Sequence, residues 1–112
     1  MRKSLKNQLE IGKCYFRLGY YDRNLTVPFM DSFFFIGRDL YLGTSGIWFF
    51  QSAEAFLNGQ PINLEARPED NGVIGLSEEE LEDIVDWSGL IEEFVLNKKM
   101  QDEGKFLSQR VS

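Results

Sequence analysis

Two short apolar runs place large side chains on both faces of any strand that they form. Residues 33–36 read FFFI and residues 47–50 read IWFF. Successive strand side chains point to opposite sides, so such a run fills both faces of a sheet. We expect either a helix over each face or a sheet that curls around its own core. The alternative is that one face stays partly open and binds a partner or a second copy of the chain.

Apolar alternation and turn residues predict three strands, at residues 9–22, 29–36 and 47–51. Polar residues 22–24 and the glycine-containing segment 37–46 separate them as turns. Strands that are sequential and closely linked usually pair with one another. The simplest topology is therefore an antiparallel meander.

The first predicted strand has one apolar face and one face that mixes bases with aromatics. The apolar face holds Cys14, Phe16, Leu18 and Tyr20, and the mixed face holds Lys13, Tyr15, Arg17 and Tyr21. Bases interleaved with aromatics are one way to bind single-stranded nucleic acid. The chain lacks the RNA-recognition consensus and is acidic overall, so the pattern favours a charge-protected edge strand instead. Cys14 is expected to be a buried, inert thiol.

A short helix and a fourth strand are predicted next along the chain. Ser52 has the character of an N-cap for a helix over residues 53–58, and Gly59 suits the position just after its end. Residues 60–72 contain two prolines and read as a loop. Residues 73–76 form a short apolar segment that fits a fourth strand.

Two further helices are predicted toward the end of the chain. Ser77 and Glu80 have the spacing of a capping box, in which each side chain bonds the backbone N–H of the other residue. Leu81, Ile84 and Val85 would form the buried stripe of the helix that follows. A second apolar stripe, on Trp87, Leu90, Ile91, Phe94 and Val95, is out of phase with the first. We therefore expect a break at residues 86–89, with Asp86 or Ser88 capping the second helix.

Acids and bases are segregated along the chain. Residues 1–38 hold seven bases and three acids, whereas residues 39–97 hold thirteen acids and one base. The net charge is -6. On the predicted helix, Glu79, Glu82, Asp83 and Asp86 would share one solvated face. Such a face is either ordinary helix surface or a negative surface matched to a basic partner.

The composition excludes several classes of function. The chain has no histidine and one cysteine, which removes Ser-His-Asp and Cys-His catalysis and cysteine-based metal clusters. The carboxylates lack the spacing of a calcium loop. We expect no cofactor, metal or catalytic residue. The single cysteine and the lack of a signal sequence or membrane span favour a cytoplasmic location.

The sequence predicts an α+β fold over residues 1–112 as a single domain. A small, mainly antiparallel sheet of three to four strands would carry two to three helices, in the order β-β-β-α-(β)-α-α, with residues 101–112 as a tail that frays or docks. The predicted function is a protein-interaction module, such as an inhibitor or immunity-type protein that binds a basic partner. The alternative is a homodimeric structural or adaptor protein. An enzyme and a nucleic-acid binder are less favoured.

Two surfaces are the candidate binding sites. The first is the acidic helix face, formed by Glu79, Glu82, Asp83, Asp86 and Glu93. The second is a sheet face for a partner or a second copy, formed by Tyr15, Arg17, Phe33, Phe35 and Phe49.

Overall fold

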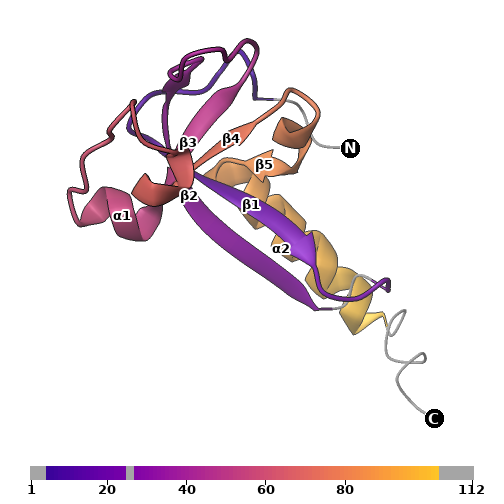
Figure 1. Cartoon of the computed structure of the whole chain (residues 1–112). Helices are drawn as coiled ribbons and strands as arrows, with labels where there is room; N and C mark the ends of the chain where they lie inside the picture. The colour runs from indigo at the N-terminus through magenta and orange to yellow at the C-terminus, as the bar shows by residue number, and fades with distance from the viewer. Residues whose placement is uncertain (1–4, 25–26, 104–112) are drawn as a thin grey trace.

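The structure, a computed structural model, describes residues 5–24 and 27–103. Within these residues the fold is α+β, with one five-stranded antiparallel sheet and two α-helices (Figure 1). The strands are β1 (Cys14–Tyr20), β2 (Pro28–Arg38), β3 (Trp48–Ser52), β4 (Val73–Leu76) and β5 (Ile84–Val85). The helices are α1 (Ala53–Leu57) and α2 (Trp87–Asp102), with single 3-10 turns η1 (Pro68–Asn71) and η2 (Glu80–Asp83).

The strand order across the sheet is β4-β3-β2-β1-β5. The predicted meander is confirmed, since β1 pairs with β2 and β2 with β3, all antiparallel. The fourth strand has the predicted bounds and pairs with β3. The sheet has five strands where three to four were predicted, because β5 adds to the free edge of β1.

The helix predicted after the capping box is wrong beyond its first turn. Both capping hydrogen bonds form: Glu80 N donates to Ser77 Oγ at 3.3 Å, and Ser77 N donates to Glu80 Oε1 at 3.0 Å. The chain then makes only the 3-10 turn η2 before it extends into β5. Pairing with Phe16 and Arg17 of β1 gives the β5 backbone hydrogen-bond partners that a continued helix would have supplied internally.

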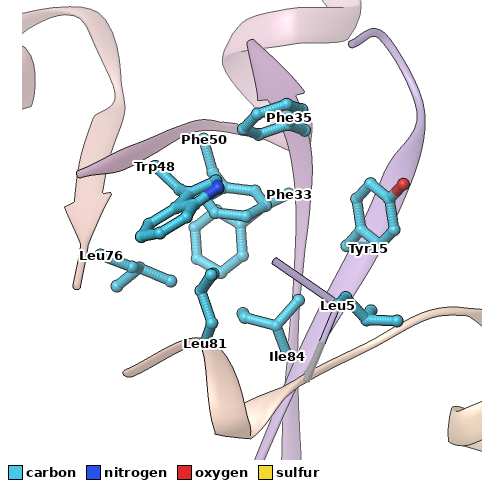
Figure 2. Close-up of a cluster of buried hydrophobic side chains, with 9 residues drawn as sticks. All are labelled: Leu5, Tyr15, Phe33, Phe35, Trp48, Phe50, Leu76, Leu81 and Ile84. Atoms are coloured by element: carbon cyan, nitrogen blue, oxygen red, sulfur yellow. The ribbon is translucent and has the colours of Figure 1, made fainter. Parts of the chain in front are cut away.

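The central core lies between one sheet face and the segments that cross it (Figure 2). Leu81 of η2 and Ile84 of β5 point toward the aromatic rings of β2 and β3, and both are fully buried. Tyr15 packs edge-on to Phe50, and its hydroxyl accepts a hydrogen bond from the backbone of Glu10 at 2.9 Å. The cluster consists of Leu5, Tyr15, Phe33, Phe35, Trp48, Phe50, Leu76, Leu81 and Ile84.

The opposite sheet face is covered by the two helices and by loops. Phe56 of α1 stacks on Phe34 of β2, with ring centroids 4.1 Å apart. Leu90 of α2 packs onto Phe16 and Leu18 of β1. Each face of the sheet is therefore packed by other parts of this chain. The expected helix over each face is not observed, because the N-terminal residue Leu5 and the 3-10 turn η2 cover the central core face instead.

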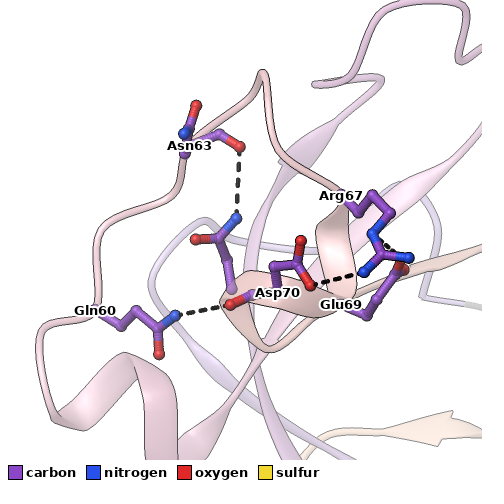
Figure 3. Close-up of polar contacts among 6 residues, drawn as sticks. Gln60, Asn63, Arg67, Glu69 and Asp70 are labelled. Atoms are coloured by element: carbon purple, nitrogen blue, oxygen red, sulfur yellow. Dashed lines mark hydrogen bonds and ion pairs between the residues drawn. The ribbon is translucent and has the colours of Figure 1, made fainter.

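Polar contacts order the long connection between α1 and β4 (Figure 3). Gln60 Nε2 donates to the carbonyl of Asp70 at 3.2 Å, and Asn71 Nδ2 donates to the carbonyl of Asn63 at 3.4 Å. Beneath this loop, the buried Gln51 donates to the carbonyl of Asn71 at 2.9 Å. The segment predicted as a loop is thus tied to β3 by side-chain donors that satisfy its carbonyls.

The predicted helix caps are confirmed. Ser52 Oγ accepts from Ala55 N at 3.3 Å at the start of α1, and Asp86 Oδ1 accepts from Gly89 N at 2.9 Å at the start of α2. The tail predicted from residue 101 begins later than expected, since α2 extends to Asp102. Residues 104–112 lie outside the described range.

Asp39 closes the loop between β2 and β3 with a backbone of φ 51°. Its Oδ1 accepts from Ile47 N at 2.8 Å, and its own N–H donates to Ile47 O at 2.8 Å. The hydrogen bond from Ile47 N–H holds the pKa of the Asp39 carboxyl below its ordinary value of 3.8. The folded state thus favours the ionised carboxylate.

We predict that Asp39 stabilises the fold above its ordinary pKa and that this contribution is lost as the pH falls through the lower, folded-state pKa. Asp39→Asn keeps an acceptor oxygen and tolerates positive φ, but does not titrate. Urea unfolding of both proteins between about pH 2.5 and 6 tests this. The wild-type advantage should shrink toward the acid end. A difference that stays constant with pH would contradict the prediction.

In the described part of the chain, the helices are too short or too polar to cross a membrane.

Candidate functional site

A groove lies between the N-terminal turn (residues 5–8), the edge strand β5 and the first turns of α2. Its volume is about 550 Å³. Leu5 and Gln8 come from the N-terminal turn, where Gln8 N donates to Leu5 O at 2.7 Å. Its lining is Leu5, Gln8, Ile84, Val85, Asp86, Ser88, Gly89, Glu92, Glu93 and Leu96. Segments from opposite ends of the sequence therefore build one site.

The groove combines an apolar floor with carboxylates. Its three charged lining residues, Asp86, Glu92 and Glu93, are all acids. Gln8 and Ser88 add neutral hydrogen-bonding groups. Negative groups beside apolar surface favour a ligand that presents a cation on an apolar stem, as lysine and arginine side chains do.

The five predicted acidic residues do not share one helix face, because the helix that would have aligned them is absent. Glu79, Glu82 and Asp83 are exposed on or beside η2. Asp86 caps α2, and Glu93 lies half-buried within it. Only Asp86 and Glu93 line the groove. Glu92 is the third acid of the groove and belongs to the same acidic stretch of sequence. Leu5 and Gln8 also line the groove, but no local pattern in the sequence indicates that they belong to this site.

The prediction that the candidate sheet face is exposed is wrong, because four of its five residues are buried. Tyr15, Phe33 and Phe35 are buried in the central core, and Phe49 is buried on the opposite face with Tyr41. The pairing of Phe35 with Phe50 sends Phe49 to the other side of the sheet.

Arg17 is the one residue of the predicted sheet face that stays partly exposed. It makes an ion pair with Asp31 at 3.1 Å, and its guanidinium lies 5.3 Å from the Phe33 ring centroid. Within this chain, Asp31 therefore pairs with the charge of Arg17, and the Phe33 ring lies under its guanidinium group.

The second apolar stripe does not face the core as its pattern suggested. Only Leu90 of the stripe is buried, while Trp87, Ile91, Phe94 and Val95 are exposed. The side of α2 that meets the sheet includes Gly89, where a Cβ would lie 3.0 Å from the Cβ of Val85. A larger side chain there would press on Val85, so glycine allows this close approach. Trp87 packs edge-on to Phe16 of β1, while Ile91, Phe94 and Val95 remain exposed.

Cys14 is half-buried beside the Phe16–Leu90 cluster. Burial raises the pKa of its thiol, which disfavours the reactive thiolate. Among the described residues, no group of three or more Cys, Asp or Glu side chains is placed to hold a metal ion.

Comparisons with known proteins found no matching protein family, no similar curated protein and no similar solved structure.

Proposed function

We propose that this chain is a protein-interaction module that binds a basic partner protein through the groove between the N-terminal turn, β5 and α2. The observation that carries the proposal is the lining itself. Every charged residue in it is acidic, and the floor is apolar. A lysine or arginine of the partner would place its alkyl stem against Leu5 and Leu96, and its charge near Glu92.

The charge distribution around the groove supports the same partner. The exposed acids of η2 precede β5 directly, and the whole chain carries a net charge of -6. Such a field speeds encounter with a basic surface and disfavours acidic ones. An inhibitor or immunity-type protein that masks a basic surface is one concrete form of this function.

The test introduces a positively charged side chain into the groove by substitution. Gln8 is an exposed lining residue, so Gln8→Lys adds a positive charge there without opening the core. We expect binding of the basic partner to weaken by at least about tenfold, since like charges then face each other. Ser45→Lys is the matched control, because it adds the same charge at an exposed turn outside the groove.

The measurement uses the purified protein as bait in an extract from its native source, with quantitative mass spectrometry at low and high salt. The proposal expects one basic protein, retained near stoichiometry by the wild type and by Ser45→Lys. High salt and Gln8→Lys should each release it. Equal retention by both variants, or retention of no basic protein by the wild type, would reject the groove as the binding site.

A further inference from the structure

The N-terminal wall of the groove carries one of the chain's own lysines. Leu5 and Gln8 line the groove, and the hydrogen bond from Gln8 N to Leu5 O at 2.7 Å closes a tight turn between them. Lys6 is the second residue of this turn. Leu5 is buried in the central core with Ile84, which fixes the position of the turn (Figure 2). The backbone of Lys6 is therefore held at the edge of the groove, one residue from a lining side chain.

The side chain of Lys6 does not line the groove but binds a carboxylate outside it. Its Nζ donates to Glu78 Oε1 at 2.6 Å, across 72 positions of sequence. This hydrogen bond, and then the positive charge of Lys6, hold the pKa of the Glu78 carboxyl below its ordinary value of 4.5. Glu78 lies in the segment that precedes η2 and is not part of the groove lining. The pair therefore directs the charge of Lys6 away from the groove acids.

Lys6 has the same chemistry as the partner group that the groove favours. A lysine side chain is an apolar stem that ends in a cation. Asp86 and Glu92 would attract this cation as they would attract that of a partner. A lysine tethered at the edge of the groove would also compete strongly, because an intramolecular contact acts at a high effective concentration.

We propose that Glu78 is a positioning residue for the groove: it holds Lys6 outside and so leaves the groove acids to the cation of a partner. This inference rests on the proposed function, since it concerns the same groove and the same ligand chemistry. It adds a residue outside the lining that sets the affinity of the site. Without Glu78, the Lys6 side chain would turn toward Asp86 and Glu92 and take the place of the partner's lysine.

A purely fastening role for the ion pair leads to different expectations. If the pair served only to fasten the N-terminal turn, loss of either Lys6 or Glu78 would disturb the groove equally. If Glu78 keeps Lys6 out, loss of Glu78 alone weakens binding, while loss of Lys6 leaves the groove open. A double-mutant cycle on these two residues therefore separates the two roles.

The first measurement follows Lys6 by NMR in the free protein. Nuclear Overhauser contacts from the Lys6 side chain to Gly89 and Leu96, which both line the groove, should be much stronger in Glu78→Gln than in the wild type. Glu79→Gln is the matched control, because it removes the same charge from the next exposed residue and should leave Lys6 on Glu78. Lys6 contacts in Glu78→Gln that equal those of the wild type would overturn the proposal.

The second measurement titrates n-butylammonium, an amine with the four-carbon stem of lysine, at constant ionic strength. The amide resonances of Ser88 and Gly89 report its binding in the groove. The dissociation constant should rise about two- to fivefold in Glu78→Gln, a modest effect because exposed ion pairs are weak. Lys6→Met and the double variant Lys6→Met/Glu78→Gln should stay within about twofold of the wild type, since no lysine is left to compete. Equal weakening in all three variants would overturn the proposal in favour of the fastening role.

Failure of this inference and failure of the proposed function are read from different variants. The proposed function fails if Gln8→Lys and Ser45→Lys retain the basic partner equally. The role of Glu78 fails if Glu78→Gln leaves the position of Lys6 and the affinity for the amine unchanged. Either result can occur without the other, because the first concerns the partner and the second concerns the free protein and a small amine.

Discussion

Replacement of Phe50 by alanine should cost about 3–5 kcal/mol of unfolding free energy, which is the usual loss for a phenylalanine removed from a packed core. Phe50 is 0% exposed and lies at the centre of the main cluster. Its ring packs against Tyr15 and Phe35, with centroid distances of 6.3 and 5.3 Å. The loss includes both the transfer of the ring to water and the cavity that remains.

Urea unfolding followed by far-UV circular dichroism measures this effect, with the change read from the midpoint at constant slope. Domains of ordinary stability unfold with about 5–15 kcal/mol, so Phe50→Ala removes a large share of the total. Leu57→Ala serves as the control, because Leu57 is exposed on α1 and its loss should stay within about 0.5 kcal/mol. Comparable losses at the two positions would show that the core is not centred on Phe50.

The second large effect concerns Gly72, which ends η1 with φ 70°. A Cβ at this position would lie 2.9 Å from the Cβ of Ala55 and 3.0 Å from Ser52 Oγ. The carbonyl of Gly72 also accepts from Ser52 N at 2.8 Å, so the two segments cannot separate freely. Gly72→Ala should therefore cost about 2–4 kcal/mol, of which about 1–2 comes from the left-handed backbone and the rest from overpacking.

Gly59 provides a matched control for the backbone part of this cost. It has the same φ of 70°, but no heavy atom lies within 4 Å of a Cβ built there. Gly59→Ala should therefore lose only the backbone contribution of about 1–2 kcal/mol. Urea midpoints of the two variants compare the costs directly. Equal losses at both glycines would show that the contacts of Gly72 with Ala55 and Ser52 relax at no cost.

Local signals in the sequence predicted local structure well. The strand at residues 73–76, the Ser52 cap and the two hydrogen bonds between Ser77 and Glu80 all appear where their residues indicated. The two caps depend on groups that lie within about four positions of one another, whereas the strand also needs its distant partner β3. For the caps, the chain therefore carries all the information that the feature needs in one short segment.

The stretch from Leu81 to Val85 shows why a periodic apolar pattern was not sufficient to predict an α-helix. Its apolar spacing fits one face of a helix, yet a 3-10 turn followed by a strand buries the same three side chains. Leu81 and Ile84 enter the central core, while Val85 joins Leu90 on the opposite face of the sheet. The pairing with β1 decided between the two structures, and the sequence contains no local sign of that pairing.

The candidate groove was only partly predictable for the same reason. Asp86 and Glu93 belong to the acidic stretch that the sequence identified, but Leu5 and Gln8 reach them only after the sheet has formed. The orientation of α2 was likewise visible only in the fold, where Gly89 lies against Val85 and Ile91, Phe94 and Val95 remain exposed.

By itself the sequence determined where the chain turns, how its two α-helices are capped and how its charges are distributed. These properties arise from backbone geometry, short-range hydrogen bonds and composition. Only the tertiary structure decided which apolar side chains are covered, because burial depends on every segment that shares a surface and not on the period of one segment. Phe49 and Ile91 illustrate the difference: both belong to apolar patterns, but the sheet encloses Phe49 and α2 leaves Ile91 in contact with water.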